Sequence, residues 1–156
     1  MATDGTTLSR STTVAAPPER VWALVSDLPR MGDYSPEAVG GSWARGDGPA
    51  VGAVFRGRNG RGLRRWSTRC TVVRCVPGRE FAFEVSAAGM VAAEWAYDVQ
   101  PEGSGCRLTE TWTDRRSGLM TTLGKVVTGV ADRSAFTASS IEQTLARVKE
   151  RAERQE

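Results

Sequence analysis

Apolar and polar residues alternate between residues 36 and 116, in short runs separated by turn-forming segments. The runs are rich in valine, threonine and aromatic residues, and the segments between them, such as RGDGP and PEGSG, are rich in glycine and proline. This punctuation is typical of antiparallel strands joined by hairpins. Together with a similar run at the start of the chain, it predicts seven strands, over residues 6–15, 37–45, 51–59, 63–76, 79–87, 91–100 and 106–115.

Parity within the predicted strands divides their side chains between two faces. In EWAYDVQ, residues 94–100, bulky apolar residues alternate with acidic or small ones, which is typical of a sheet with one buried and one wet face. The pattern predicts that Glu84, Glu94 and Asp98 face outward. It predicts an inner face that carries Trp43, Phe55, Asn59, Trp66, Phe81, Phe83, Trp95, Tyr97, Leu108, Glu110 and Trp112.

Helical patterns flank this region. Pro17 and Pro18 fit the first turn of a helix, where a missing N–H costs nothing, and Pro29 is expected to end that helix before a second short one that runs to about Tyr34. Residues 117–127 are predicted to be a linker or a short helix. Near the C-terminus, residues recur at spacings of three and four, which predicts one face of a long helix: Val130, Ser134, Thr137, Ile141, Leu145, Val148 and Ala152.

The length of 156 residues predicts a single domain over residues 1–156, with frayed tails at 1–5 and about 153–156. No apolar run approaches the ~20 residues that span a bilayer, so an integral membrane protein is not expected. The polar start has no apolar segment typical of a signal peptide, which favours a cytoplasmic location.

The chain contains no histidine, which excludes Ser-His-Asp and Cys-His catalysis and histidine-ligated metals. The three cysteines are scattered, and Cys70 and Cys75 lie too far apart along one straight predicted strand to form a disulfide. We therefore expect no metal and no cofactor. Any acid–base chemistry has to use carboxylates, tyrosine, lysine, cysteine or water.

FRGRNGRGLRRW, residues 55–66, holds five arginines and no acid. With NGRG as a hairpin tip, strand parity places Arg56, Arg58, Arg65 and Arg69 in a ladder on the solvent face. The plain interpretation is a solvated edge that resists sheet-to-sheet aggregation. A second interpretation is a contact with an anionic partner, such as an acyl carrier or a membrane surface. The formal charge of only +3 and the lack of a recognition motif argue against nucleic acid.

Several segments carry a family resemblance. VWALVSD, YSPE, VGAVFRGRN, RRWSTRCTV, VPGREFAFEV, EWAYDVQP and CRLTETW resemble the polyketide cyclase/dehydrase-like branch of the SRPBCC (START-like) superfamily, over residues 6–152. The resemblance implies an α+β helix-grip fold: a curved seven-stranded antiparallel sheet around the long C-terminal helix, with two short helices after the first strand. It also implies a deep ligand cavity. The superfamily includes aromatase/cyclases, lipid carriers and hormone-binding proteins, so it does not select an activity.

Large residues on the sheet opposite small ones on the helix can leave such a cavity open. Ser134, Thr137 and Ala138 are small, whereas the inner face of the sheet is strongly aromatic. Aromatic walls with few polar groups suit a flat, apolar ligand. The predicted ligand-binding residues are Trp43, Phe55, Asn59, Trp66, Phe83, Trp95, Trp112, Ser134, Thr137 and Ile141.

Three polar residues are candidates for chemistry. Glu110 is predicted to face inward, where it could catalyse, orient a ligand or form a structural pair, and burial would raise its pKa. Arg64 shares the parity of Trp66 and could hold a carboxylate or enolate oxygen, or form a salt bridge at the rim. Tyr97 could donate a proton or simply satisfy its hydroxyl in the core.

Three hypotheses follow. The first is a protein that binds an aromatic or polyketide-like molecule and guides its cyclisation or dehydration through proximity and orientation, which needs no histidine. The second is a non-catalytic binder or carrier of lipids or hydrophobic metabolites. The third is an interaction module with a collapsed cavity.

Overall fold

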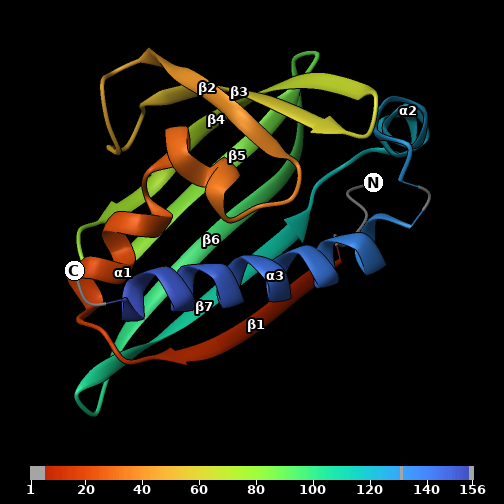
Figure 1. The fold of residues 1–156 in the computed structure, drawn as a ribbon. Coiled ribbons are helices and arrows are strands. Elements are labelled where there is room, and N and C mark those ends of the chain that lie inside the picture. The colour runs from red at the N-terminus through yellow and green to blue at the C-terminus, as the bar shows by residue number, and fades with distance from the viewer. Residues whose placement is uncertain (1–5, 131, 155–156) are drawn as a thin grey trace.

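A single curved sheet wraps around one long helix (Figure 1). The computed structural model describes residues 6–130 and 132–154. The seven strands pair antiparallel in the order β1-β7-β6-β5-β4-β3-β2. Their bounds are Thr7–Val14 (β1), Ala38–Arg45 (β2), Val54–Arg61 (β3), Arg64–Val76 (β4), Glu80–Ala87 (β5), Met90–Glu102 (β6) and Gly105–Asp114 (β7). The helices are α1 (Pro18–Val25), the 3-10 helix η1 (Leu28–Asp33), α2 (Gly118–Thr128) and α3 (Arg133–Glu153).

The core lies between the concave face of the sheet and α3. Ile141, Leu145 and Val148 of α3 are buried, as are Val99 and Leu108 of the facing strands. Helix α1 packs on the same face of the sheet and is tied to β5, because the Trp22 indole N–H donates to the carbonyl of Glu80 at 2.8 Å. This arrangement confirms the predicted helix-grip fold.

The helix boundaries follow local capping chemistry. Helix α1 ends at Val25, before Pro29, which instead lies in the first turn of η1, where a proline fits. The long helix α3 begins at Arg133. Asp132 is its N-cap, because its carboxylate accepts a hydrogen bond from the Ala135 N–H at 3.1 Å. The predicted segment 117–127 forms a short helix, the second of its two alternatives, and α2 spans Gly118–Thr128 with Ser117 as its N-cap.

The tail prediction is partly wrong. Glu153 is the last residue of α3, and its carboxylate accepts a hydrogen bond from the backbone N–H of Ala15 at 2.9 Å. Residues 1–5 and 155–156, which were also predicted to fray, lie outside the described residues.

The tip of the β3–β4 hairpin lies later than NGRG predicts. Strand β3 continues to Arg61, and only Gly62 and Leu63 form the turn before β4 begins at Arg64. Gly62 has a φ of 61°, the left-handed region that a tight turn requires and that glycine adopts without strain. The pairing of Asn59 with Trp66 keeps the predicted parity for the rest of both strands.

Cys70, Cys75 and Cys106 are free thiols. Burial raises the pKa of the Cys70 thiol to about 12, so this group stays protonated at neutral pH.

Among the described residues, none of the helices has the length and apolar character needed to cross a membrane.

Candidate ligand cavity

A cavity of about 530 Å³ opens between the concave face of the sheet, the first half of α3, α2 and η1. Its size falls within the range of roughly 300–1,000 Å³ that is typical of small-molecule sites. Aromatic side chains, methionines and small residues make up most of its walls. The predicted third hypothesis, a collapsed cavity, is therefore wrong.

Adjacent strands contribute an aromatic wall. Phe83, Trp95 and Trp112 lie side by side on β5, β6 and β7, because the register pairs Phe83 with Trp95 and Trp95 with Trp112. The rings of Trp95 and Trp112 lie 6.5 Å apart between centroids. Trp66 and Phe55 extend the wall onto β4 and β3. A flat ligand would therefore meet ring faces or edges over much of its area.

On β6 and β7, the next row of inward-facing residues is polar. The register pairs Tyr97 of β6 with Glu110 of β7, so both side chains project from the concave face into the cavity. The Tyr97 hydroxyl donates to Oε2 of Glu110 at 2.8 Å. The other oxygen, Oε1, is buried and has no hydrogen-bond partner in the described part of the chain.

The protonation state of this pair follows from its burial. Burial raises the pKa of Glu110 to about 8, although the hydrogen bond from Tyr97 opposes the shift. Burial and the neighbouring Glu110 raise the pKa of Tyr97 well above its ordinary value. At neutral pH, Glu110 is therefore mainly a neutral acid whose O–H can donate a hydrogen bond into the cavity.

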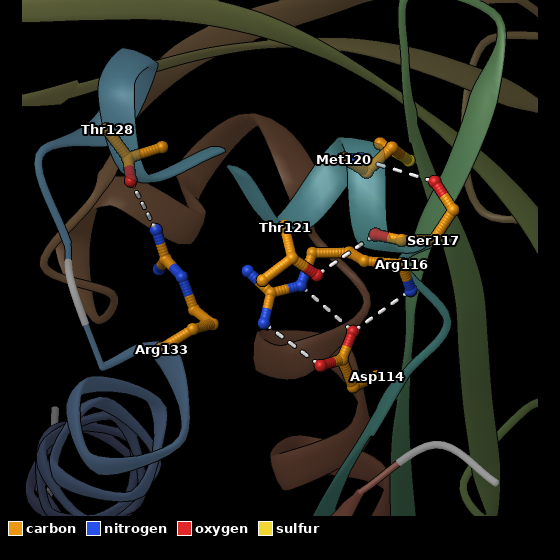
Figure 2. Close-up of polar contacts among 7 residues, drawn as sticks. All are labelled: Asp114, Arg116, Ser117, Met120, Thr121, Thr128 and Arg133. Carbon is orange, nitrogen blue, oxygen red and sulfur yellow. Dashed lines mark hydrogen bonds and ion pairs between the residues drawn. The ribbon is translucent and has the colours of Figure 1, made fainter. Parts of the chain in front are cut away.

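Two arginines, Arg116 and Arg133, line the rim and are held by polar contacts (Figure 2). Arg116, which follows β7, binds Asp114 through Nε and Nη2, each at 2.9 Å. Burial works against ionisation of Asp114, but the hydrogen bonds and the charge of Arg116 outweigh it and lower the pKa of the carboxyl. The pair therefore stays ionised and fixes the chain where β7 leads into α2.

Arg133, also at the rim, joins three elements. It donates to Glu37, just before β2, at 2.7 Å. It also donates to the hydroxyl of Thr128, the last residue of α2, at 3.0 Å (Figure 2). Its guanidinium also lies 5.2 Å from the ring centroid of Phe136, and that of Arg61 lies 5.5 Å from the same ring. Cation–π contacts at these distances are stabilising.

Helix α2 forms the roof of the cavity. Its N-terminus is fixed by Ser117, whose hydroxyl accepts from the Met120 N–H at 3.2 Å and whose carbonyl accepts from the Thr121 hydroxyl at 3.0 Å (Figure 2). Met120, Leu123 and Val127 then face the cavity. The roof is thus apolar, whereas the rim below it is charged.

Most of the predicted site residues meet at this cavity. Those that line it are Phe55, Asn59, Trp66, Phe83, Trp95, Trp112 and Thr137, together with Glu110 and Tyr97. The Asn59 side chain is oriented by its amide N–H, which donates to the Thr68 hydroxyl at 3.0 Å.

Four predicted residues lie elsewhere: Trp43, Ser134, Ile141 and Arg64. Trp43 packs edge-on against Phe55, at 5.4 Å between ring centroids, and so stands behind the wall. Ile141 is fully buried against the sheet, and Ser134 lies off the cavity-lining face of α3.

The prediction that Arg64 points into the cavity is also wrong. Its parity was correct, but it is the first residue after the hairpin turn, beyond the rim. It is exposed and donates to the Val126 carbonyl of α2 at 2.5 Å.

The prediction included Thr137 but missed the rest of the polar side of α3 and the two rim arginines. Arg133, Ser140 and Thr144 line the cavity together with Thr137, at helical spacings of four, three and four. Arg116 continues the even-numbered parity of Glu110 and Trp112 past the end of β7. Both signals were available in the sequence.

The predicted arginine ladder is on the solvent side. Arg56, Arg58, Arg65 and Arg69 are all exposed. Arg58 also contributes to the lining of the cavity, which its parity did not predict. Its guanidinium lies beside Gly40.

The chain matches the family described as polyketide cyclase / dehydrase and lipid transport over residues 5–153. A polyketide-cyclase-like protein from Corynebacterium glutamicum shares 31% identity, with 93% of this chain and 90% of that chain covered and a TM-score of 0.66. No protein among curated sequences matches the chain.

More distant structures share the fold alone. The di-domain ARO/CYC StfQ from the steffimycin biosynthetic pathway is 14% identical, with 96% of this chain and 51% of that chain covered and a TM-score of 0.74. The major latex-like protein 151 of Panax ginseng is 10% identical, with 97% and 100% covered and a TM-score of 0.72. With the match over nearly its whole length, the chain belongs to the polyketide cyclase / dehydrase and lipid transport family.

Proposed function

We propose that this protein binds an aromatic or polyketide-like molecule in the cavity and holds a carbonyl oxygen of that molecule at Glu110. The observation that carries the proposal is the free Oε1 atom of Glu110, buried at the end of an aromatic wall. A buried polar atom without a partner is costly, and a ligand oxygen would supply the missing hydrogen bond. Membership of a family associated with polyketides and lipids supports a hydrophobic ligand.

The protonation state of Glu110 selects the ligand group. Below a pKa of about 8, the neutral acid can donate its O–H to a ketone oxygen while Tyr97 donates to Oε2. Above that pKa, the carboxylate can only accept, so a ketone loses its hydrogen bond and faces a negative charge. Binding of a ketone should therefore weaken as the pH rises through 8.

Titrations with 2-acetylnaphthalene, a flat aromatic ketone, test this. Trp66, Trp95 and Trp112 line the cavity, so binding should quench tryptophan emission and raise the melting temperature. For the wild type, we expect the affinity to fall about tenfold between pH 6 and pH 9, equal to about 1.4 kcal/mol for one lost hydrogen bond. In Glu110→Gln, which stays neutral, the affinity should not depend on pH.

Two controls separate the ketone contact from the cavity itself. Naphthalene has no oxygen, so its affinity should not fall with pH. Ser140→Leu places a larger side chain where the cavity wall is small, and it should abolish binding of both molecules while the protein stays folded. Saturating ketone without any change in fluorescence or melting temperature would contradict the proposal.

A second function, dehydration or cyclisation of the bound molecule, is favoured by the same neutral acid. Protonated Glu110 could give its proton to a leaving hydroxyl as the C–O bond breaks. The resulting carboxylate could then take a proton from the adjacent carbon as the double bond forms, which releases water and restores the acid. Product formation from a β-hydroxy ketone that fits the cavity, lost in Glu110→Gln, would distinguish this function from non-catalytic carriage.

The arginine ladder supports a further part of the proposal, an acidic partner such as an acyl carrier protein. Arg56, Arg58, Arg65 and Arg69 are exposed and positively charged. Salt-sensitive binding of an acyl carrier protein that is lost in Arg56→Gln/Arg69→Gln would support it. Equal binding by the wild type and this variant would contradict it.

A further inference from the structure

Helix α2 carries apolar side chains that nothing in the described structure covers. Leu119 and Val126 are 64% and 67% exposed, and Leu123 is 47% exposed. Scattered single apolar residues on a surface need no explanation, but a cluster indicates an interaction site.

The apolar arc of α2 is wider than the cavity that it covers. Successive residues of a helix turn by roughly 100°, so Met120, Leu123 and Val127 share the face toward the cavity. Leu119 and Val126 continue the same arc beyond the cavity, onto the solvent side. Packing over the ligand therefore does not account for the whole arc.

The tip of the β3–β4 hairpin extends this patch. Leu63 is fully exposed there. Its neighbour Arg64 ties the tip to α2 through the bond to the Val126 carbonyl. Gly129, which ends α2 with a φ of 73°, leaves room for this contact, since a Cβ atom at that position would lie 2.5 Å from Nε of Arg64. Figure 1 shows the hairpin beside α2. We call Leu63, Leu119, Leu123 and Val126 the α2 patch.

Basic side chains surround the α2 patch. Arg61, Arg64, Arg65 and Lys125 are exposed, and within residues 6–130 and 132–154 none of them forms an ion pair. The two carboxylates of the rim, Asp114 and Glu37, are already paired with Arg116 and Arg133. The surface thus combines aliphatic side chains with an uncompensated positive charge.

We propose that the α2 patch docks on the surface of an anionic lipid bilayer. Aliphatic side chains can enter the region between headgroups and acyl chains, while arginine and lysine contact lipid phosphates. A second copy of this chain fits less well, because two such surfaces would bring like charges together. The patch is purely aliphatic, without the aromatic anchors that are common at protein interfaces.

Docking in this way would place the roof of the cavity against the bilayer. A hydrophobic molecule could then move between the acyl chains and the cavity without crossing water. This consequence rests on the proposed function, whereas docking itself does not.

Sedimentation with lipid vesicles tests the proposal, with the ligand-free protein and two vesicle compositions. We expect binding to vesicles of phosphatidylcholine mixed with phosphatidylglycerol, and at least tenfold weaker binding to pure phosphatidylcholine. Leu119→Ser/Val126→Ser should reduce binding to the mixed vesicles at least tenfold. Lys125→Gln should reduce it about fivefold, the usual effect of one basic residue near a charged bilayer.

Matched controls lie at the far end of β3. Val51 is 67% exposed, the same fraction as Val126, and Arg45 is also exposed. Val51→Ser and Arg45→Gln should leave vesicle binding unchanged. Glu110→Gln should also bind normally, so that failure of the proposed ligand contact remains distinguishable from failure of docking.

Three results would overturn the proposal: no binding to mixed vesicles, equal loss in the Val51 control, or binding that Leu119→Ser/Val126→Ser does not weaken. A stable dimer in sedimentation velocity that the same double variant dissociates would assign the α2 patch to a second copy instead, and would also overturn it.

Discussion

Replacement of Glu110 by glutamine should change how stability depends on pH. Burial raises the pKa of Glu110 from 4.5 to about 8 in the native state. Between these values the native protein keeps a proton that the unfolded chain releases. The free energy of unfolding should therefore fall as the pH rises through this window, by about 1.4 kcal/mol per pH unit. Above pH 8 the loss should reach roughly 5 kcal/mol.

This loss is large beside the 5–15 kcal/mol that stabilises a typical domain. The chain has no histidine, so no imidazole titrates in the same window. Glutamine has nearly the shape of the protonated acid and cannot ionise. At pH 5, Glu110→Gln should differ from the wild type by no more than about 1 kcal/mol, because its amide oxygen can still accept from Tyr97. At pH 9, the variant should be the more stable protein by several kcal/mol.

Urea unfolding followed by circular dichroism at pH 5, 7 and 9 measures the effect. Glu84→Gln is the matched control, since Glu84 lies on the other face of the sheet and is only partly buried. Its difference from the wild type should not depend on pH. If the wild type and Glu110→Gln lose stability in parallel between pH 5 and pH 9, then Glu110 is not a buried neutral acid, and the reasoning about the Tyr97–Glu110 pair fails.

Three further predictions use the same assay. Tyr97→Phe removes the hydrogen bond that favours the charged form of Glu110 and so raises the native pKa of Glu110 further. The stability loss should begin at the same pH but continue to higher pH, and the protein should be about 1–2 kcal/mol less stable at pH 7. An unchanged pH profile would contradict the bond. Arg133→Gln leaves the half-buried Glu37 carboxylate without its cation and should lower stability by about 1–3 kcal/mol, largely restored by the second change Glu37→Gln. Arg56→Gln on the solvent face should change stability by less than about 0.5 kcal/mol at any pH, and a larger loss would mean that the ladder supports the sheet.

The fold could be predicted because strand parity and helix spacing are local signals. The alternation around Tyr97 and Trp95 fixed which side of β6 is buried, and hydrogen-bond pairing carried the same parity to β5 and β7. The position of the hairpin tip was harder to predict. NGRG contains several turn-forming residues, and the observed turn uses only the last of them, Gly62, together with Leu63. The error displaced the end of β3 by two residues but left the parity intact.

Only part of the cavity-lining face of α3 could be found from the stripe of residues at helical spacing. An apolar stripe marks residues that pack against the sheet, as Ile141 and Leu145 do. Residues that line an open cavity pack against little, so Ser140 and Thr144 follow the edge of the stripe, and only Thr137 belongs to both the stripe and the cavity wall. Arg64 shows the related limit of parity, which gives the side of a strand but not the point where the strand leaves the cavity.

The double contact of Arg133 has a kinetic consequence. Its bonds to Glu37 and Thr128 connect α3, the segment before β2 and the end of α2 at one point of the rim. A molecule that passes this point in either direction has to separate the same contacts. Their energy therefore enters the barrier for entry and for exit equally and cancels from the equilibrium between them. The rim can thus set the residence time of a bound molecule independently of the affinity that the aromatic wall and Glu110 provide.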